Sequence, residues 1–189
     1  DETYPQGEQM EYTQEWNLHR TTSAELREKD RQYVNIDDYR YAAEVHRQVR
    51  QWAQQWFKPG VSDLFAATQI ERKVKELVGE DMPTRGMAFP CGLSTNNCAA
   101  HFTPNPGDPL YFYKADDVVS VDFGVQVNGH LIDSAFTLTW DPEMQPFLEC
   151  SRDATNTGIK NMGVDVRLCD IGDAIEEVIR SYEITVKGK

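Results

Sequence analysis

Apolar residues between positions 37 and 57 recur every three or four residues, which is the spacing of one face of an α-helix. This face comprises Tyr39, Ala42, Ala43, Val45, Val49, Trp52, Ala53 and Trp56. Lys58, Pro59 and Gly60 follow directly, and proline cannot continue a helix whereas glycine suits the turn after one. The pattern therefore predicts an amphipathic helix over residues 37–57.

A second helix is predicted from Ser62, whose hydroxyl suits an N-cap, to Gly79, where a glycine suits the end of a helix. Two more helices are expected at roughly residues 143–161 and 171–182, with a short extended connector at residues 163–167. Residues 184–186 have the composition of a new strand. Residues 1–34 are polar and weakly patterned, so we expect an extended N-terminal strap, with a short helix at 23–31 as a candidate.

Residues 118–140 alternate between apolar and polar positions on both sides of Asn128-Gly129, which is the strongest short-range signal for a β-hairpin. If these two residues form the loop, Asp122 faces Ala135 and Asp133 faces Gly124. The two aspartates then lie on one face as diagonal neighbours. The opposite face, a predicted core face, carries Val121, Phe123, Val125, Val127, Ile132, Phe136, Leu138 and Trp140.

The two carboxylates lie opposite glycine and alanine, which leave room beside them. Diagonal neighbours are about 7–8 Å apart at the backbone, so Asp122 and Asp133 could reach inward to share two metal ions about 3.5–4 Å apart. Without a metal they would repel, and one would take up a proton. A solvated polar face is the alternative, and spacing alone leaves both interpretations open. Asp116 and Asp117 are read as a turn into the strand rather than as ligands.

Residues 79–113 are rich in glycine, proline and asparagine, which predicts a loop region with short strands. His101 lies there, just before Pro104 and Asn105. A lone histidine is more often structural than catalytic. Close to a carboxylate pair, however, it becomes a candidate proton carrier or substrate donor, because its pKa lies near neutrality.

Composition narrows the class of protein. The 189 residues are 40% hydrophobic and 26% charged, as in an ordinary globular domain. The net charge of −12 argues against a nonspecific grip on nucleic acid. There is no bilayer-length apolar run and no basic-then-apolar N-terminal segment, so we expect no membrane association and a cytoplasmic location. Reduced thiols are expected because the spacing of Cys91, Cys98, Cys150 and Cys169 fits neither a CxxC pair nor a compact disulfide scaffold.

Three long motifs then point to a family: AFPCGLSTNNCAAHFTPNPGD, VDFGVQVNGHLIDSAFT and DATNTGIKNMGVDVRLCDIGDAIEEVI. Together with AAEVHRQVR, the KPG stop and WNLHRTTSAE, they resemble the type 2 methionine aminopeptidases, in particular the eukaryotic members. The resemblance implies an α+β protein of the pita-bread (creatinase/aminopeptidase) fold, an antiparallel sheet with helices packed on one face. Residues 35–189 would be the first half of the catalytic domain, with the second half outside this sequence.

The resemblance also implies an activity, removal of the initiator methionine from nascent chains whose second residue is small. Two divalent ions (cobalt, manganese, zinc or iron) serve as cofactors, with Asp122 ligating one and Asp133 bridging both. His101 would be the catalytic residue that contacts the substrate, and Phe89 would line the methionine pocket. The family completes its metal site with a histidine and two glutamates from the second half, so this chain alone is expected to be incomplete and inactive.

A non-catalytic pita-bread factor, associated with ribosomes or growth regulation, is the competing hypothesis. A pure binding protein has no need for Asp122, Asp133 and His101 together, which favours the enzyme. The partners implied are nascent peptide N-termini and the remaining half of the catalytic domain, with the ribosome as a further candidate. The residues leave the physiological metal open.

Overall fold

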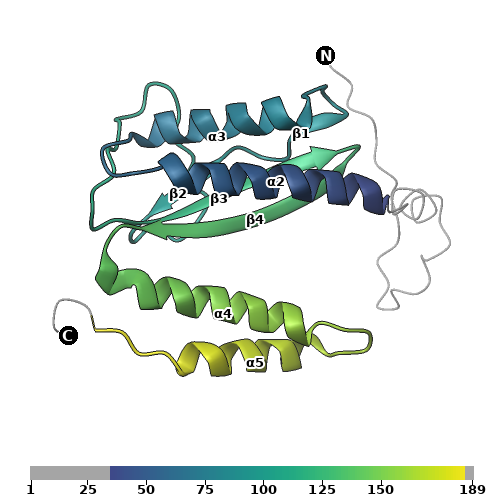
Figure 1. Ribbon diagram of the computed structural model, residues 1–189, viewed down its shortest axis with the longest axis vertical. Coiled ribbons are helices and arrows are strands. Elements are labelled where there is room, and N and C mark those ends of the chain that lie inside the picture. The colour runs from purple at the N-terminus through teal and green to yellow at the C-terminus, as the bar shows by residue number, and fades with distance from the viewer. Residues whose placement is uncertain (1–34, 186–189) are drawn as a thin grey trace, which may run out of the picture. The chain divides into compact units, whose positions relative to one another are not determined.

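The computed structural model describes residues 35–185, so the strap expected at residues 1–34, with its candidate helix, lies outside the described part. The elements, in chain order, are α2 (Ile36–Trp56), α3 (Asp63–Val78), β1 (Arg85–Met87), β2 (Gly92–Thr95), β3 (Val118–Val127), β4 (His130–Thr139), the 3₁₀ turn η2 (Pro142–Met144), α4 (Gln145–Asn161) and α5 (Leu168–Arg180). The predicted helices and hairpin are confirmed, in an α+β arrangement (Figure 1).

Strand β3 lies at the centre of an antiparallel sheet. Strand β4 pairs with it along its whole length, while β1 and β2 pair with successive parts of its other edge. The loop residues Asn128 and Gly129 have φ angles of 51° and 79°, as a type I′ turn requires. This turn sets the predicted register, in which Asp122 pairs with Ala135 and Gly124 pairs with Asp133.

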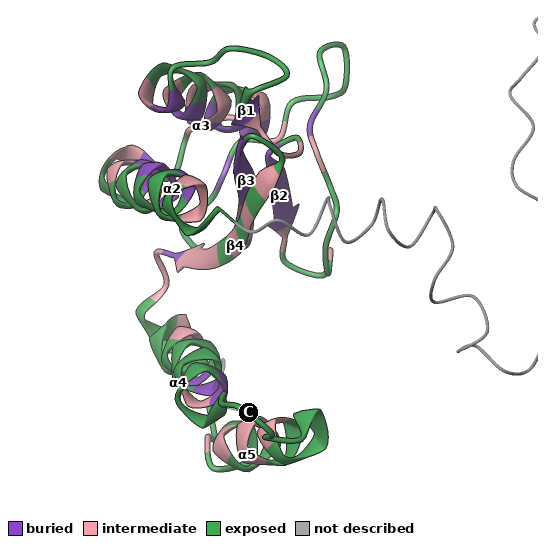
Figure 2. Cartoon of the chain, turned by 90° about the vertical axis from the view of Figure 1, so that its right-hand side faces the viewer, coloured by how far each residue is buried: buried purple, intermediate pink, exposed green. Residues whose placement is uncertain are grey.

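Helices α2 and α3 cover one face of this sheet (Figure 2). The hairpin residues predicted for the core face lie there: Val121, Phe123, Val125 and Val127 are buried, and Ile132, Phe136, Leu138 and Trp140 pack against them. The helices contribute Ala42, Val49, Ile70 and Val74, each 0% exposed. Because side chains alternate along a strand, Asp122 and Asp133 lie on the other face of the sheet.

The predicted limits of the second helix are confirmed at both ends. The Ser62 side chain accepts a hydrogen bond from the backbone N–H of Phe65 at 3.3 Å. At the other end, Gly79 adopts a left-handed φ of 63° and its N–H donates to the carbonyl of Lys75. These interactions use groups that the helix itself leaves unpaired.

The C-terminal part corrects three expectations. Residues 163–167 form a turn, with Asp165 at a φ of 64°, instead of an extended connector. Helix α5 begins at Leu168 rather than residue 171, because the guanidinium of Arg167 spans its first turn to the Asp170 carboxylate at 2.7 and 3.0 Å. Ile184 and Thr185 form no strand, since no described strand pairs with them; residue 186 lies outside the described part.

The reading of Asp116 and Asp117 as a turn is confirmed. Asp116 lies in the turn before β3, and Asp117 is only 3% exposed. The Asp117 carboxylate accepts hydrogen bonds from the side chains of Asn96 and Tyr111 and from the backbone N–H of Lys114. It therefore holds the loop and the start of β3 together.

All four cysteines are free thiols, as expected; Cys91 and Cys150 are buried, whereas Cys169 is exposed. Within residues 35–185, no helix combines the length and apolar character needed to cross a membrane.

Candidate metal and substrate site

Asp122 lies in the middle of β3 and is flanked by very small residues. Its register partners are Gly92 on β2 and Ala135 on β4. A Cβ added to Gly92 would lie 3.6 Å from the Cβ of Asp122, so Gly92 packs directly beside this aspartate. The small neighbours leave the carboxylate room on the face of the sheet away from α2.

Asp133 emerges from β4 on the same face, opposite Gly124. Burial and then the nearby Asp133 carboxylate raise the pKa of Asp122. The Asp133 carboxylate is thus close enough to oppose the ionisation of Asp122, and a cation or a proton between them would relieve the repulsion.

The environment of one carboxylate oxygen of Asp122 favours the binding of a cation at this position. Its Oδ1 is buried and accepts no hydrogen bond from the described residues. A buried carboxylate oxygen without a donor is costly unless something positive meets it, and carboxylate oxygens are good ligands for divalent ions. The two aspartates therefore fit part of a metal site. They do not complete one, because no group of three or more potential ligand residues gathers among residues 35–185.

His101 approaches the same carboxylate from the loop after β2. The carbonyl of the next residue, Phe102, accepts a hydrogen bond from Leu93 N–H at 2.7 Å, which fastens this loop beside β2. His101 itself has a φ of 63° and an exposed side chain, and its proximity acts to lower the pKa of Asp122. The structure thus brings the exposed side chain of His101 near Asp122.

Phe89 lies against the floor of the site. The N–H of Ala88 donates to the carbonyl of Gly124 at 3.0 Å, which brings the segment before Phe89 alongside β3. A Cβ added to Gly124 would lie 2.3 Å from Cε1 of Phe89, so the ring occupies the space that any larger residue would need. Because Gly124 pairs with Asp133, Phe89 forms an apolar wall next to the carboxylates.

Sequence reasoning missed one residue behind this site. His46 on α2 is 2% exposed, and its Nε2 lies 3.0 Å from the carbonyl oxygens of both Phe123 and Ser134. Burial lowers the pKa of His46. A signal was available, because position 46 falls in the apolar stripe between Ala42 and Val49.

The pattern that defines metallopeptidase family M24 matches residues 37–188 of this sequence, a stretch that includes all four predicted site residues. The chain belongs to metallopeptidase family M24. This membership agrees with a carboxylate pair on a sheet face, because carboxylate oxygens are good ligands for divalent metal ions.

Within M24, the chain is similar to proteins named methionine aminopeptidase 2. It is 52% identical to the one from Komagataella phaffii over 190 residues, which cover 100% of this chain and 42% of that protein. It is 50% identical to the one from Phaeosphaeria nodorum over 196 residues, covering 100% and 45%. The predicted resemblance is confirmed, and the chain spans less than half the length of these relatives.

Similar solved structures confirm the pita-bread fold. The X-Pro aminopeptidase from Thermotoga maritima superposes with a TM-score of 0.64 at 15% identity, over 83% of this chain and 45% of that one. The prolidase from Pyrococcus furiosus gives 0.65 at 15% identity, over 84% and 47%. At these identities the likeness concerns the fold alone.

Proposed function

We propose that the complete protein is a metallo-aminopeptidase that removes the initiator methionine from nascent polypeptides with a small second residue. One observation carries this proposal: Asp122 and Asp133 share one face of a hairpin, and a buried oxygen of Asp122 has no donor among the described residues. The sequence identity of 52% and 50% to two proteins named methionine aminopeptidase 2 supports the substrate class. Nascent peptide N-termini in the cytoplasm are the proposed substrates, and the ribosome is a proposed partner.

Asp122 and Asp133 are proposed to be the residues of this chain that would hold the divalent ions, with cobalt, manganese, zinc and iron as candidates. When bound, such ions polarise the scissile carbonyl and make water a better nucleophile. Asp122 and Asp133 hold negative charge where the cations are needed, and the small residues Gly92 and Ala135 keep that face open to a peptide end.

His101 and Phe89 are proposed to bind the substrate. His101 is exposed beside the carboxylates, so its imidazole can donate a hydrogen bond to the substrate near its N-terminus and can carry a proton there. Phe89 offers an apolar surface next to Asp133, which suits the thioether side chain of methionine.

Two carboxylates hold a metal pair only with further ligands and an orienting second shell. We propose that a second half of the catalytic domain supplies a histidine and two glutamates, so the 189-residue chain alone is inactive. A purified sample of this chain should release no methionine from a Met-Ala-Ser peptide with added manganese. Robust release would contradict the need for a second half.

The test of the site is Asp122→Asn in the complete protein, with Asp116→Asn in the exposed turn as the matched control. We expect Asp122→Asn to lower manganese affinity and Met-Ala-Ser turnover together, by at least about 100-fold, the upper end of what losing an outer-shell partner costs. The control should change neither. Normal turnover with normal metal content in Asp122→Asn would contradict the assignment.

A further inference from the structure

His46 is a polar ring inside the apolar layer between α2 and the sheet. It is 2% exposed, and its helix neighbours Ala42 and Val49 are 0% exposed. A buried imidazole in such a layer is costly unless its N–H groups find acceptors. What His46 contacts is therefore informative about its role.

The contacts of His46 join two strands. Its Nε2 lies 3.0 Å from the carbonyl oxygen of Phe123 on β3 and 3.0 Å from that of Ser134 on β4. Carbonyl oxygens only accept, so Nε2 carries a proton that is shared between them. Phe123 and Ser134 are direct register partners. One donor therefore links the two strands of the hairpin on the face opposite the aspartates.

The bridged residues directly follow the two site aspartates. Phe123 comes after Asp122, and Ser134 comes after Asp133. Because successive side chains point to opposite faces, the carboxylates lie on one face of the sheet while His46 approaches from the other. The imidazole is also stacked on the Phe123 ring, with centroids 4.1 Å apart and planes 11° from parallel, which restricts its position.

We propose that His46 is a positioning residue that sets the separation of the Asp122 and Asp133 carboxylates by tying their strands together. The inference rests on the proposed function, in which these carboxylates hold metal ions. Ligands must be placed to within about 0.5 Å of the working geometry. A shared donor at the adjacent residue pair restrains sliding and twisting of the two strands where this accuracy is needed.

Two substitutions in the complete protein separate the donor from the packing. His46→Phe keeps a flat ring for the stack on Phe123 but removes the N–H, whereas His46→Gln places an amide N–H at a similar reach. Manganese dissociation constants are measured by isothermal titration calorimetry on samples shown to be folded by circular dichroism. We expect His46→Phe to weaken manganese binding by about tenfold, and His46→Gln to recover most of that loss.

A matched control tests whether a general loss of stability is enough to weaken manganese binding. Val49→Ala opens a cavity on the same buried helix face without removing a donor to the hairpin, so it should lower stability and leave manganese affinity unchanged. Wild-type affinity in His46→Phe would overturn the proposal. Equal weakening by Val49→Ala at equal loss of stability would also overturn it.

Asp122→Asn in the same titration distinguishes this proposal from the proposed function. If Asp122→Asn binds manganese as tightly as the wild type, the metal site itself is wrongly assigned. If Asp122→Asn loses manganese while His46→Phe does not, only the positioning role fails. Should His46→Phe not fold, His46→Met fills the space with a flexible apolar chain and gives the same contrast with His46→Gln.

Discussion

Within the 189-residue chain, two parts bury their apolar surface to very different degrees. The sheet layer, residues 36–139, has a continuous core of buried side chains drawn from α2, α3 and the sheet. The helical pair, residues 145–180, buries only Cys150, Ala154 and Gly158 on α4, and no residue of α5 (Figure 2). Large apolar side chains such as Leu168, 85% exposed, remain at its surface.

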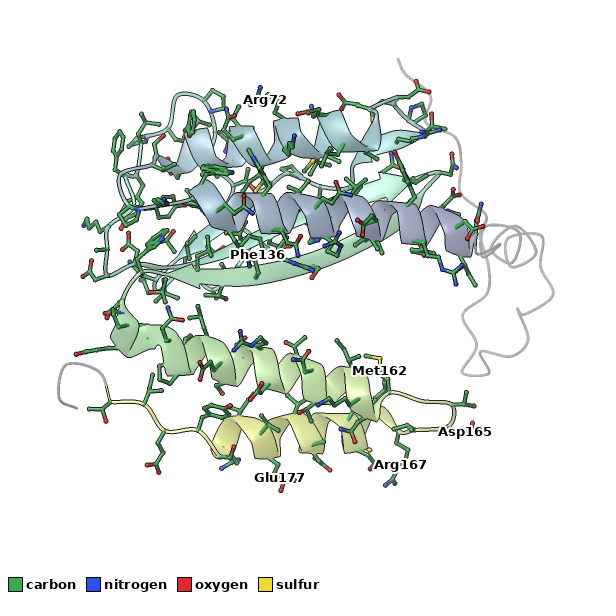
Figure 3. All side chains as sticks on the ribbon, in the orientation of Figure 1. Arg72, Phe136, Met162, Asp165, Arg167 and Glu177 are labelled. Atoms are coloured by element: carbon green, nitrogen blue, oxygen red, sulfur yellow. The ribbon has the colours of Figure 1, made fainter. Side chains whose placement is uncertain are left out.

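Amphipathic patterning alone does not explain the difference. Helix α5 has clearly separated polar and apolar faces, yet its described contacts are to α4, where Ile175 packs against Gly158. The side chains of Arg167 and Glu177 point away from α4 (Figure 3). A pattern thus shows which face of a helix can be buried, whereas the burial achieved depends on how much surface lies opposite it. Substitutions should therefore have unequal effects in the two parts.

The largest contrast is expected for isoleucine truncation. Ile70→Ala in the sheet layer removes a side chain that is 0% exposed and should lower the free energy of unfolding by about 2–5 kcal/mol. In the 189-residue chain alone, Ile179→Ala in α5 removes a side chain that is 49% exposed and should cost less than about 1 kcal/mol. Urea denaturation measures both, and equal losses would remove the distinction between the two parts.

A smaller contrast is expected for two aspartates. Burial by itself would raise the pKa of Asp117, but hydrogen bonds from Asn96, Lys114 and Tyr111 lower it overall. At pH 7, Asp117→Asn should cost about 2–3 kcal/mol, as expected for lost hydrogen bonds to a charged group. Asp170→Asn, which breaks an exposed ion pair with Arg167, should cost less than about 1 kcal/mol.

The Asp117 effect should depend on pH. Because its pKa is lower in the folded than in the unfolded chain, its contribution is complete above the unfolded value of about 3.9. The contribution disappears as pH falls through the folded value. Denaturation from pH 7 to pH 2 should therefore show the difference between wild type and Asp117→Asn shrinking below about pH 4; a constant difference would contradict the assignment.

The smallest individual effects are expected for the same Gly→Ala substitution at two positions, where the effects on stability have opposite signs. Gly79→Ala places a side chain at a left-handed φ of 63° and should destabilise the sheet layer by about 1 kcal/mol, although nothing lies within 4 Å of the new Cβ. Gly172 lies inside α5, and a Cβ added there also meets nothing within 4 Å. Gly172→Ala should therefore stabilise the chain by about 0.5–1 kcal/mol. Thermal unfolding followed by circular dichroism checks both signs.

Local signals in the sequence determined the hairpin and the shared face of Asp122 and Asp133. Asn128 and Gly129 accept positive φ, the turn they form sets the register, and a two-residue alternation then assigns every side chain to a face. The ends of α3 were predictable for the same reason, since Ser62 and Gly79 act on backbone groups a few residues away. Each of these features depends on neighbours within a short stretch of chain.

Only the tertiary structure decided which residues, distant in sequence, pack on the hairpin face that carries Asp122 and Asp133 and on the opposite face. The packing of Phe89 on Gly124 and the bridge from His46 to Phe123 and Ser134 join residues far apart in sequence. The same holds for strands, because Ile184 and Thr185 have a strand-like composition but no described partner. Periodicity and propensity describe what a segment can do; burial and hydrogen bonding also need the surface opposite, which only the fold supplies.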